Sequence, residues 1–226
     1  MEVEAAKRAA GEAAAALVDT GMLVGLGTGS TAYWFTIALG RRVEEGLRIR
    51  AVATSARTEA LALDHGIEVV EIDRRGIDLA IDGADCVDRD LRLIKGAGGA
   101  MVREKIVAVA GRRFVVVVDW TKLTDELTGR IPVEVVPFGS EHTLALLDAT
   151  GGSYAVRRDA EGRPILTDND NLLADGEYTI IDDPEGLSAR LDAIPGVVGH
   201  GLFLGMADLV LVGHVDGSVE RLTPRR

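Results

Sequence analysis

The residues of this 226-residue chain that could do chemistry are concentrated between positions 82 and 105, in the segment DGADCVDRDLRLIKGAGGAMVREK. Among its charged groups are the carboxylates of Asp82, Asp85 and Glu104 and the ammonium group of Lys95, each near the end of an expected strand or early in an expected helix. Groups of these types can move protons on a substrate and neutralise an oxyanion. The packing of a hydrophobic core gives no reason for such charged groups, so we expect the segment to form the reactive centre.

The two aspartates could instead complete a turn or bind a metal ion. Aspartate often hydrogen-bonds its own turn at the end of a strand. A metal site would be expected to draw on histidine as well, but the four histidines are scattered without ligand spacing: His65, His142, His200 and His214. We therefore predict a reactive centre without a metal.

Glu104 has two interpretations that its spacing alone does not separate. It could be a surface carboxylate paired with its neighbours Arg103 or Lys105. It could also lie partly out of water on a helix whose second half, residues 106–110, is apolar all round. In that case its pKa would be raised toward that of a useful general base.

A second candidate site is the glycine-rich segment Gly25–Thr31 (GLGTGST), between an expected strand and an expected helix. Free amide groups and the helix dipole make this arrangement an anion site, and Ser30 or Thr31 could cap the helix and bind a phosphate oxygen. A dinucleotide fingerprint would need a third glycine at position 30 and an acidic residue after the second strand, where Ala53-Thr54-Ser55 stand. A turn without a ligand is the other alternative. We favour a phosphate site for a small ligand.

Apolar runs alternate with helical patterns through the first half of the chain. The pattern predicts strands over 22–26, 50–54, 68–72, 77–81, 91–94 and 113–118, and helices over 3–19, 32–45 and 58–65. Such alternation is typical of an α/β fold with a Rossmann-like, doubly wound and mainly parallel sheet. Ligands bind beyond the carboxyl ends of such strands, where both candidate segments lie.

The pattern changes after about residue 127. It predicts strands over 133–137, 153–158, part of 171–181 and 197–204, with helices over 141–149 and 184–193. The order β-α-β-β-α-β is that of a ferredoxin-like unit. An apolar strand over 207–212 then returns to the main sheet. We predict a Rossmann-like catalytic domain, 1–127 and 207–226, and an inserted small α+β domain, 128–206.

Composition excludes several classes of partner and location. The net charge of −11 argues against nucleic acid or an anionic membrane as a partner. No apolar run approaches the eighteen or so residues that a membrane span needs. A single cysteine, Cys86, rules out a disulfide within the chain and fits a reducing compartment. We therefore expect a cytoplasmic protein.

Four segments together closely resemble the ribose-5-phosphate isomerases of the A type: Gly25–Thr31 (GLGTGST), Asp82–Asp85 (DGAD), Lys95–Ile106 (KGAGGAMVREKI) and Ile194–Val198 (IPGVV). The resemblance covers essentially the whole chain. It implies conversion of D-ribose 5-phosphate to D-ribulose 5-phosphate through an enediol(ate), in the non-oxidative branch of the pentose phosphate pathway. It also implies the absence of a metal or nicotinamide cofactor, and a small domain that makes contacts in a homodimer or homotetramer.

The resemblance also assigns roles to residues. Glu104 would accept the proton, and Asp82, Asp85 and Lys95 would act with it. The residues that would bind substrate are Thr28, Gly29, Ser30, Thr31, Asp82, Gly83, Ala84, Asp85, Lys95, Gly96, Ala97, Gly98 and Lys122, with Lys7 as a further phosphate contact.

The chain departs from the family pattern at two positions. Cys86 stands where an acidic residue is usual, and Asp170 where glycine is common. Two alternative functions stand beside the isomerase. One is a related isomerase or deaminase acting on another sugar phosphate, such as a hexose. The other is a sugar-phosphate sensor without catalysis, which would lose the base that this chain keeps as Glu104.

Overall fold

The computed structural model describes residues 2–224, which form two compact units. The first unit runs up to Ala84 and includes 103–123 and the chain from Gly205 onward; the second comprises 85–102 and 124–204. Residues 85–102 therefore pack with the second unit, whereas we predicted them within the first domain. The boundaries of the functional domains stay a prediction. Within residues 2–224 we find no helix with the length and apolarity needed to cross a membrane.

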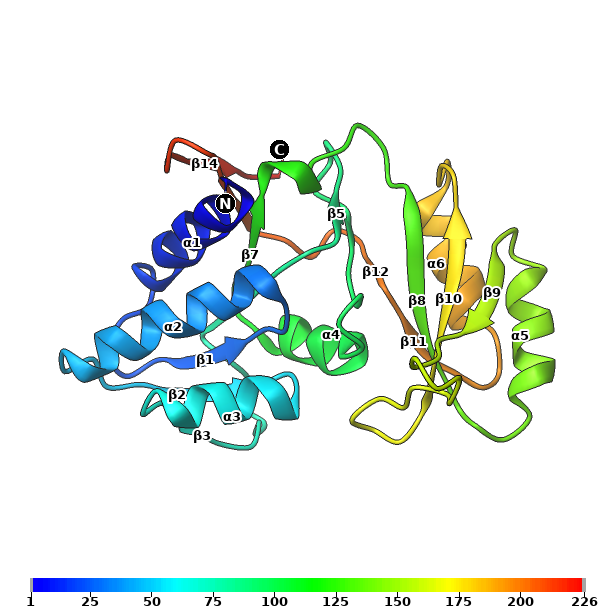
Figure 1. The fold of residues 1–226 in the computed structure, drawn as a ribbon, viewed down its shortest axis with the longest axis horizontal. Helices are drawn as coiled ribbons and strands as arrows, with labels where there is room; N and C mark the ends of the chain where they lie inside the picture. The colour runs from blue at the N-terminus through cyan, green and yellow to red at the C-terminus, as the bar shows by residue number, and fades with distance from the viewer. Residues whose placement is uncertain (1, 225–226) are drawn as a thin grey trace. The chain divides into compact units, whose positions relative to one another are not determined.

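The first unit contains a seven-stranded sheet in the order β14-β13-β7-β4-β1-β2-β3 (Figure 1). Its strands are β1 (Leu23–Leu26), β2 (Arg50–Ala53), β3 (Glu68–Val69), β4 (Leu79–Asp82), β7 (Phe114–Asp119), β13 (Leu209–Gly213) and β14 (Val219–Leu222). All pairs are parallel except β13 with β14. The doubly wound parallel sheet is thus confirmed, and β14 is an antiparallel edge strand that the sequence pattern did not predict.

Helices of the first unit pack closely against each other and against this sheet. They are α1 (Glu2–Ala15), α2 (Ser30–Glu44), α3 (Ala56–Asp64) and α4 (Met101–Ala110), with a short 3₁₀ helix, η1 (Trp120–Lys122). Gly11 lets α1 approach α2, because a Cβ there would lie 2.6 Å from the Phe35 nitrogen. Gly25 does the same for α4 on β1, because its Cβ would lie 2.5 Å from Val107 Cγ1.

The second unit contains a four-stranded antiparallel sheet in the order β11-β8-β10-β9. Its elements are β8 (Gly129–Val135), α5 (Ser140–Asp148), β9 (Ser153–Val156), β10 (Leu172–Tyr178), α6 (Pro184–Asp192) and β11 (Val197–His200). One face of β8, with Ile131, Val133 and Val135, is fully buried in a core with Leu187 and Leu191. The predicted ferredoxin-like order is therefore confirmed.

A three-stranded sheet, β12-β6-β5, completes the second unit. It consists of β5 (Cys86–Val87), β6 (Leu93–Ile94) and β12 (Leu202–Phe203). We predicted one strand over 197–204, which is wrong because the chain changes sheet at Gly201. The Gly201 amide donates to the Pro132 carbonyl at 2.7 Å, and its carbonyl accepts from the Lys95 amide at 2.8 Å. A Cβ at position 201 would lie 2.3 Å from the carbonyl oxygen of Lys95, so only glycine fits there.

Candidate functional site

The first part of the site lies where the strand order of the seven-stranded sheet reverses. β1 and β4 are neighbours in the sheet, and β2 and β7 lie on their outer sides. In open α/β sheets, ligands bind beyond the carboxyl ends of two such strands. The register pairs Leu26 with Ile81, so Gly27, which follows β1, lies beside Asp82, the last residue of β4.

Gly27 lies so close to Asp82 that no residue with a side chain could take its place. Asp82 is 3 % exposed, and its Oδ1 accepts hydrogen bonds from the Thr28 amide at 3.0 Å and the Gly83 amide at 2.7 Å. A Cβ at Gly27 would lie 2.0 Å from Asp82 Oδ1 and 2.5 Å from Asp82 Cα. The carboxylate is thus joined to the glycine-rich segment, and position 27 requires glycine.

Replacing Gly27 with alanine is expected to destabilise the protein by about 1–3 kcal/mol, the usual cost of forcing an extra carbon into packed surroundings. The backbone on both sides must shift, so kcat should fall as well. Urea unfolding measures the first effect. Gly83→Ala is the control for stability, because its Cβ would meet only the Val117 oxygen at 3.7 Å. Equal unfolding midpoints for the two variants would contradict this account of position 27.

A buried cluster of hydroxyl groups supports the glycine-rich segment from beneath. Thr28 is 7 % exposed, and its Oγ1 lies 2.7 Å from Thr54 Oγ1, 2.8 Å from Ser55 Oγ and 3.0 Å from Thr58 Oγ1. Thr58 Oγ1 also donates to the Gly27 carbonyl at 3.2 Å. The Thr28 hydroxyl therefore points into the protein and holds the glycine-rich segment through these hydrogen bonds. Our sequence reasoning missed the other three hydroxyls, although their run after β2 was a visible signal.

The N-terminus of α2 lies directly after this segment. Its N-cap is Gly29, and no side chain among the described residues caps it. The prediction that Ser30 or Thr31 caps the helix is therefore wrong, because both lie within the first turn. Ser30 is exposed, whereas Thr31 is 6 % exposed. The amide groups of the first turn and the positive end of the helix dipole suit an anion.

A cavity of about 530 Å³ adjoins the same segment within the first unit. Gly27, Gly29 and Ser30 line one side of it, and Tyr33 and Arg57 come from α2 and α3. This volume is within the usual range for small-ligand sites. The cavity therefore offers room for a small phosphorylated molecule next to the N-terminus of α2.

Two lysines predicted to contact the substrate belong to this unit. On α1, Lys7 Nζ lies 2.9 Å from Glu4 Oε1. Hydrogen bonds from Trp34 Nε1 and then from Lys7 hold the pKa of Glu4 below its ordinary value. Lys122 is half-buried at the end of η1, which follows β7 and thus lies at the same edge of the sheet as Gly27. Contact of either lysine with a substrate stays a prediction.

Removing the Lys122 ammonium in Lys122→Ala is expected to raise KM by about tenfold and to change kcat less, as for a group that binds substrate and transition state alike. Steady-state kinetics on the sugar phosphate would measure both constants. The control is Arg75→Ala, which removes an exposed charge that pairs with its neighbour Asp73. A KM unchanged from that of the unmodified protein would remove Lys122 from the site.

Glu104 lies in the first turn of α4 and is 2 % exposed. Its interpretation as a surface carboxylate is therefore wrong. The close packing of α4 on β1, through Val107 and Gly25, holds this part of the helix against the sheet. Burial of this kind is one of the means by which enzymes adapt a carboxylate to the work of a general base.

In the second unit, the β5–β6 hairpin positions Asp85 and Lys95. The register pairs Cys86 with Ile94, so Asp85 and Lys95 come to the same, open end of the hairpin. The Asp85 amide donates to the Ile94 carbonyl at 2.8 Å. Lys95 is 2 % exposed, and its Nζ lies 5.3 Å from the centre of the Phe203 ring, within the range of a cation–π interaction.

The glycine-rich turn after Lys95 is held to the same hairpin. The Ala97 amide donates to Asp85 Oδ2 at 2.9 Å, and the Gly99 amide donates to the Gly96 carbonyl at 2.9 Å. Ala97 and Gly98 are exposed. The backbone of Gly96 has φ 101°, a region that favours glycine, and a Cβ there would lie 2.5 Å from Met101 Cβ. The turn therefore keeps a fixed relation to the Asp85 carboxylate.

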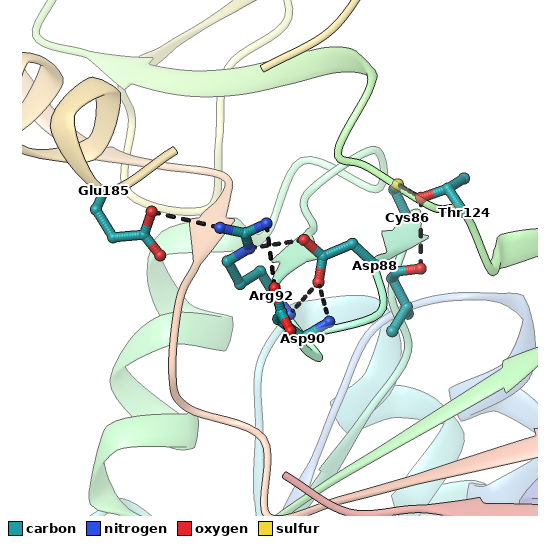
Figure 2. A network of polar contacts seen from close by, with 7 residues as sticks. Cys86, Asp88, Asp90, Arg92, Thr124 and Glu185 are labelled. Carbon is teal, nitrogen blue, oxygen red and sulfur yellow. Dashed lines mark hydrogen bonds and ion pairs between the residues drawn. The ribbon is translucent and has the colours of Figure 1, made fainter. Parts of the chain in front are cut away.

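A network of charges closes the other end of the hairpin (Figure 2). Asp88, which is 2 % exposed, accepts from the Asp90 amide at 2.9 Å and from Arg92 Nε at 2.6 Å. Arg92 also lies 3.5 Å from Glu185 on α6. Burial tends to lower the pKa of Arg92, but Asp88 and Glu185 raise it above its ordinary value. Sequence reasoning missed this network, although the spacing of Asp88, Asp90 and Arg92 resembles a turn.

The two departures from the family pattern have local explanations. Cys86 is buried, and its Sγ lies 3.1 Å from Thr124 Oγ1, so a thiol packs beside a hydroxyl here (Figure 2). Asp170 has φ 60°, a backbone conformation that favours glycine. The usual glycine of the family fits this conformation without strain.

Comparisons with known proteins give the family of the chain. The family model of ribose 5-phosphate isomerase A (phosphoriboisomerase A) matches residues 50–217. The ribose-5-phosphate isomerase A of Methanosarcina acetivorans is 48% identical over 226 residues, covering 97% of this chain and 95% of the relative. That of Thermomicrobium roseum is 50% identical over 223 residues, covering 96% and 93%.

Two solved structures extend the likeness to three dimensions. A D-ribose-5-phosphate isomerase in complex with phospho-erythronic acid has a TM-score of 0.94 and 37% identity, covering 99% of this chain and 100% of that one. Ribose 5-phosphate isomerase A from Methanocaldococcus jannaschii has a TM-score of 0.91 and 40% identity, covering 96% and 97%. The chain therefore belongs to the ribose 5-phosphate isomerase A family.

Proposed function

We propose that the protein interconverts D-ribose 5-phosphate and D-ribulose 5-phosphate through an enediol(ate) intermediate, without a metal or nicotinamide cofactor. The observation that carries the proposal is the match over nearly the full length to proteins named ribose-5-phosphate isomerase A, at 48% identity. The proposal is also supported by the N-terminus of α2, which suits a phosphate, and by the buried carboxylates Asp82 and Glu104, which are groups of the type that can transfer protons.

The phosphate group would bind at the N-terminus of α2, with Gly29, Ser30 and Thr31. This assignment is supported by the uncapped helix start and the adjoining cavity. A structural relative is described in complex with phospho-erythronic acid, which carries a phosphate group as ribose 5-phosphate does. Binding energy from the phosphate would then position the reacting carbons at the other end of the sugar.

Glu104 would transfer the proton between the two carbons. Its carboxylate takes the proton from C2 of the open-chain aldose, and the electron pair left on C2 forms the enediol(ate). The O2 hydroxyl proton passes to O1, and the protonated Glu104 returns its own proton to C1, which gives the ketose. Lys95 would neutralise the negative charge that develops on O1 and O2. Asp82 and Asp85 would move hydroxyl protons, including the one transferred when the furanose ring opens.

A coupled assay of ribose 5-phosphate conversion tests the proposal. We expect turnover that is unchanged in EDTA, because no step is assigned to a metal. Among residues 2–224, no three His, Cys, Asp or Glu side chains are grouped so that they could hold an ion. A loss of activity in EDTA that a divalent ion restores would contradict the metal-free mechanism. Faster turnover of hexose phosphates than of ribose 5-phosphate would favour the related isomerase instead.

We also propose a cytoplasmic homodimer or homotetramer. An oligomer is supported by exposed apolar side chains in the second unit: Phe138 is 92% exposed, and Val136 and Val198 are 38% and 43% exposed. The cytoplasm is supported by the lone thiol of Cys86, which leaves no partner for a disulfide within the chain. Light scattering on the purified protein would measure the mass of the assembly.

A further inference from the structure

Arg157 connects the small antiparallel sheet to the glycine-rich turn after Lys95. Its Nε and Nη2 donate to the two carboxylate oxygens of Asp175, at 2.7 and 2.5 Å. Its Nη1 donates to the carbonyl oxygen of Ala97 at 2.7 Å. The side chains of Arg157 and Asp175 are only 18% and 11% exposed. All three residues belong to the second unit.

The geometry requires a guanidinium group. Two of its N–H groups run parallel and fit a carboxylate, while the third nitrogen points elsewhere and can serve another acceptor. A lysine ammonium is a compact point charge and cannot reproduce this fork. The anchor itself is firm, because Asp175 sits within β10 and is paired with Pro132 of β8 and Ala155 of β9.

The turn that Arg157 holds has little stiffness of its own. Three of its residues, Gly96, Gly98 and Gly99, are glycines, which lose more backbone freedom on ordering than other residues do. Ala97, between them, is held from both sides: its amide donates to Asp85 Oδ2 and its carbonyl accepts from Arg157. Fixing Ala97 therefore also fixes the orientation of the Asp85 carboxylate.

We propose that the ion pair of Arg157 and Asp175 is a positioning device for the reaction, acting through Ala97 on the 95–98 segment and on Asp85. This inference rests on the proposed function, which assigns Lys95 and Asp85 to the chemistry. Arg157 is a positioning residue that acts through the Ala97 carbonyl. Its role is to keep two reacting groups in place before the substrate arrives.

The variant Arg157→Lys tests the role. We expect kcat to fall by at least about tenfold and by a larger factor than KM rises, because charge stabilisation is affected while the phosphate site at residues 27–31 is not. The urea midpoint should stay close to that of the unmodified protein. Asp175→Asn should act in the same direction. The matched control is Arg130→Lys. Arg130 is a second arginine near the same carboxylate, at 3.9 Å from Asp175, but it donates its hydrogen bond to Glu177, at 2.8 Å.

Amide hydrogen exchange at Ala97 gives a second result that does not depend on turnover. We expect exchange at Ala97 to accelerate in Arg157→Lys and to stay unchanged in Arg130→Lys. Unchanged exchange at Ala97, or kcat within twofold of the unmodified protein, would overturn the positioning role. So would a lower urea midpoint with kcat retained, which indicates a purely structural ion pair. If the unmodified protein does not isomerise ribose 5-phosphate, the proposed function fails, and the exchange result still decides whether Arg157 orders the turn.

Discussion

Glu104→Gln is expected to lower kcat by about 10²–10⁴-fold, the usual contribution of a positioned general base. Glutamine keeps the shape of the side chain and most of its hydrogen bonding, but its amide does not accept a proton from carbon at neutral pH. Ribose 5-phosphate should still bind, because residues 27–31 are untouched. The exchange of the substrate C2 hydrogen with deuterium in solvent should stop together with turnover, and proton NMR of the sugar would follow both.

Glu59→Gln is the matched control for this prediction, since Glu59 is an exposed glutamate in α3 of the same unit. It should retain full turnover. A Glu104→Gln variant that keeps more than a tenth of the unmodified kcat would refute the assignment. The proton acceptor would then have to be sought at Asp82 or Asp85, both of which are carboxylates of the same DGAD segment.

Lys95→Met is expected to lower kcat by about 10²–10³-fold, the loss seen when one group that stabilises an oxyanion is removed. Methionine has a similar length and is apolar, so it suits a position that is 2 % exposed and lies against Phe203. Removing one charge from a buried set of interacting groups can lower stability. A combined measurement of kcat and urea unfolding therefore separates loss of chemistry from loss of fold.

Lys105→Met is the control, because it is the one lysine of the four in the chain to which we assign no role in the site. Its kcat should stay within about threefold of the unmodified value, in keeping with a charge that does not act on the transition state. If Lys95→Met unfolds at a much lower urea concentration while its folded fraction turns over normally, the ammonium serves the fold. The charge on the enediolate would then need another partner.

The elements with long, regular patterns could be predicted from the sequence. The buried apolar runs of β4 and β7 predicted the doubly wound sheet. The glycine-rich segment before α2 predicted a binding site at the carboxyl ends of its strands. Two-residue strands such as β5 and β12 could not be predicted in this way. They exist only through their pairing with β6, which depends on residues distant in the chain. A run of eight residues, 197–204, therefore looked like one strand although Gly201 divides it between two sheets.

The site shows the same division between local and distant information. Asp82, Asp85, Lys95 and Glu104 stand out because charged residues interrupt apolar runs. The groups that support them do not stand out, because they act across long separations. Thr28 contacts Thr54, which is 26 residues away, and the Ala97 carbonyl binds a side chain 60 residues away. No local pattern marks such a pair, and only the folded chain brings its members together.

The β5–β6 hairpin has a consequence for how this chain can change its length. Each of its strands is only two residues long; Asp85 directly precedes β5 and Lys95 directly follows β6, at the open end. Successive residues of a strand point to opposite faces, so one residue inserted into or deleted from either strand would turn the side chain of Asp85 or Lys95 to the opposite face. The connection over residues 88–92, at the far end, does not set the face to which these side chains point, but buried Asp88 and its ion pair with Arg92 hold this turn at its length. Insertions and deletions in related chains should therefore be rare throughout the hairpin, with both short strands keeping their length.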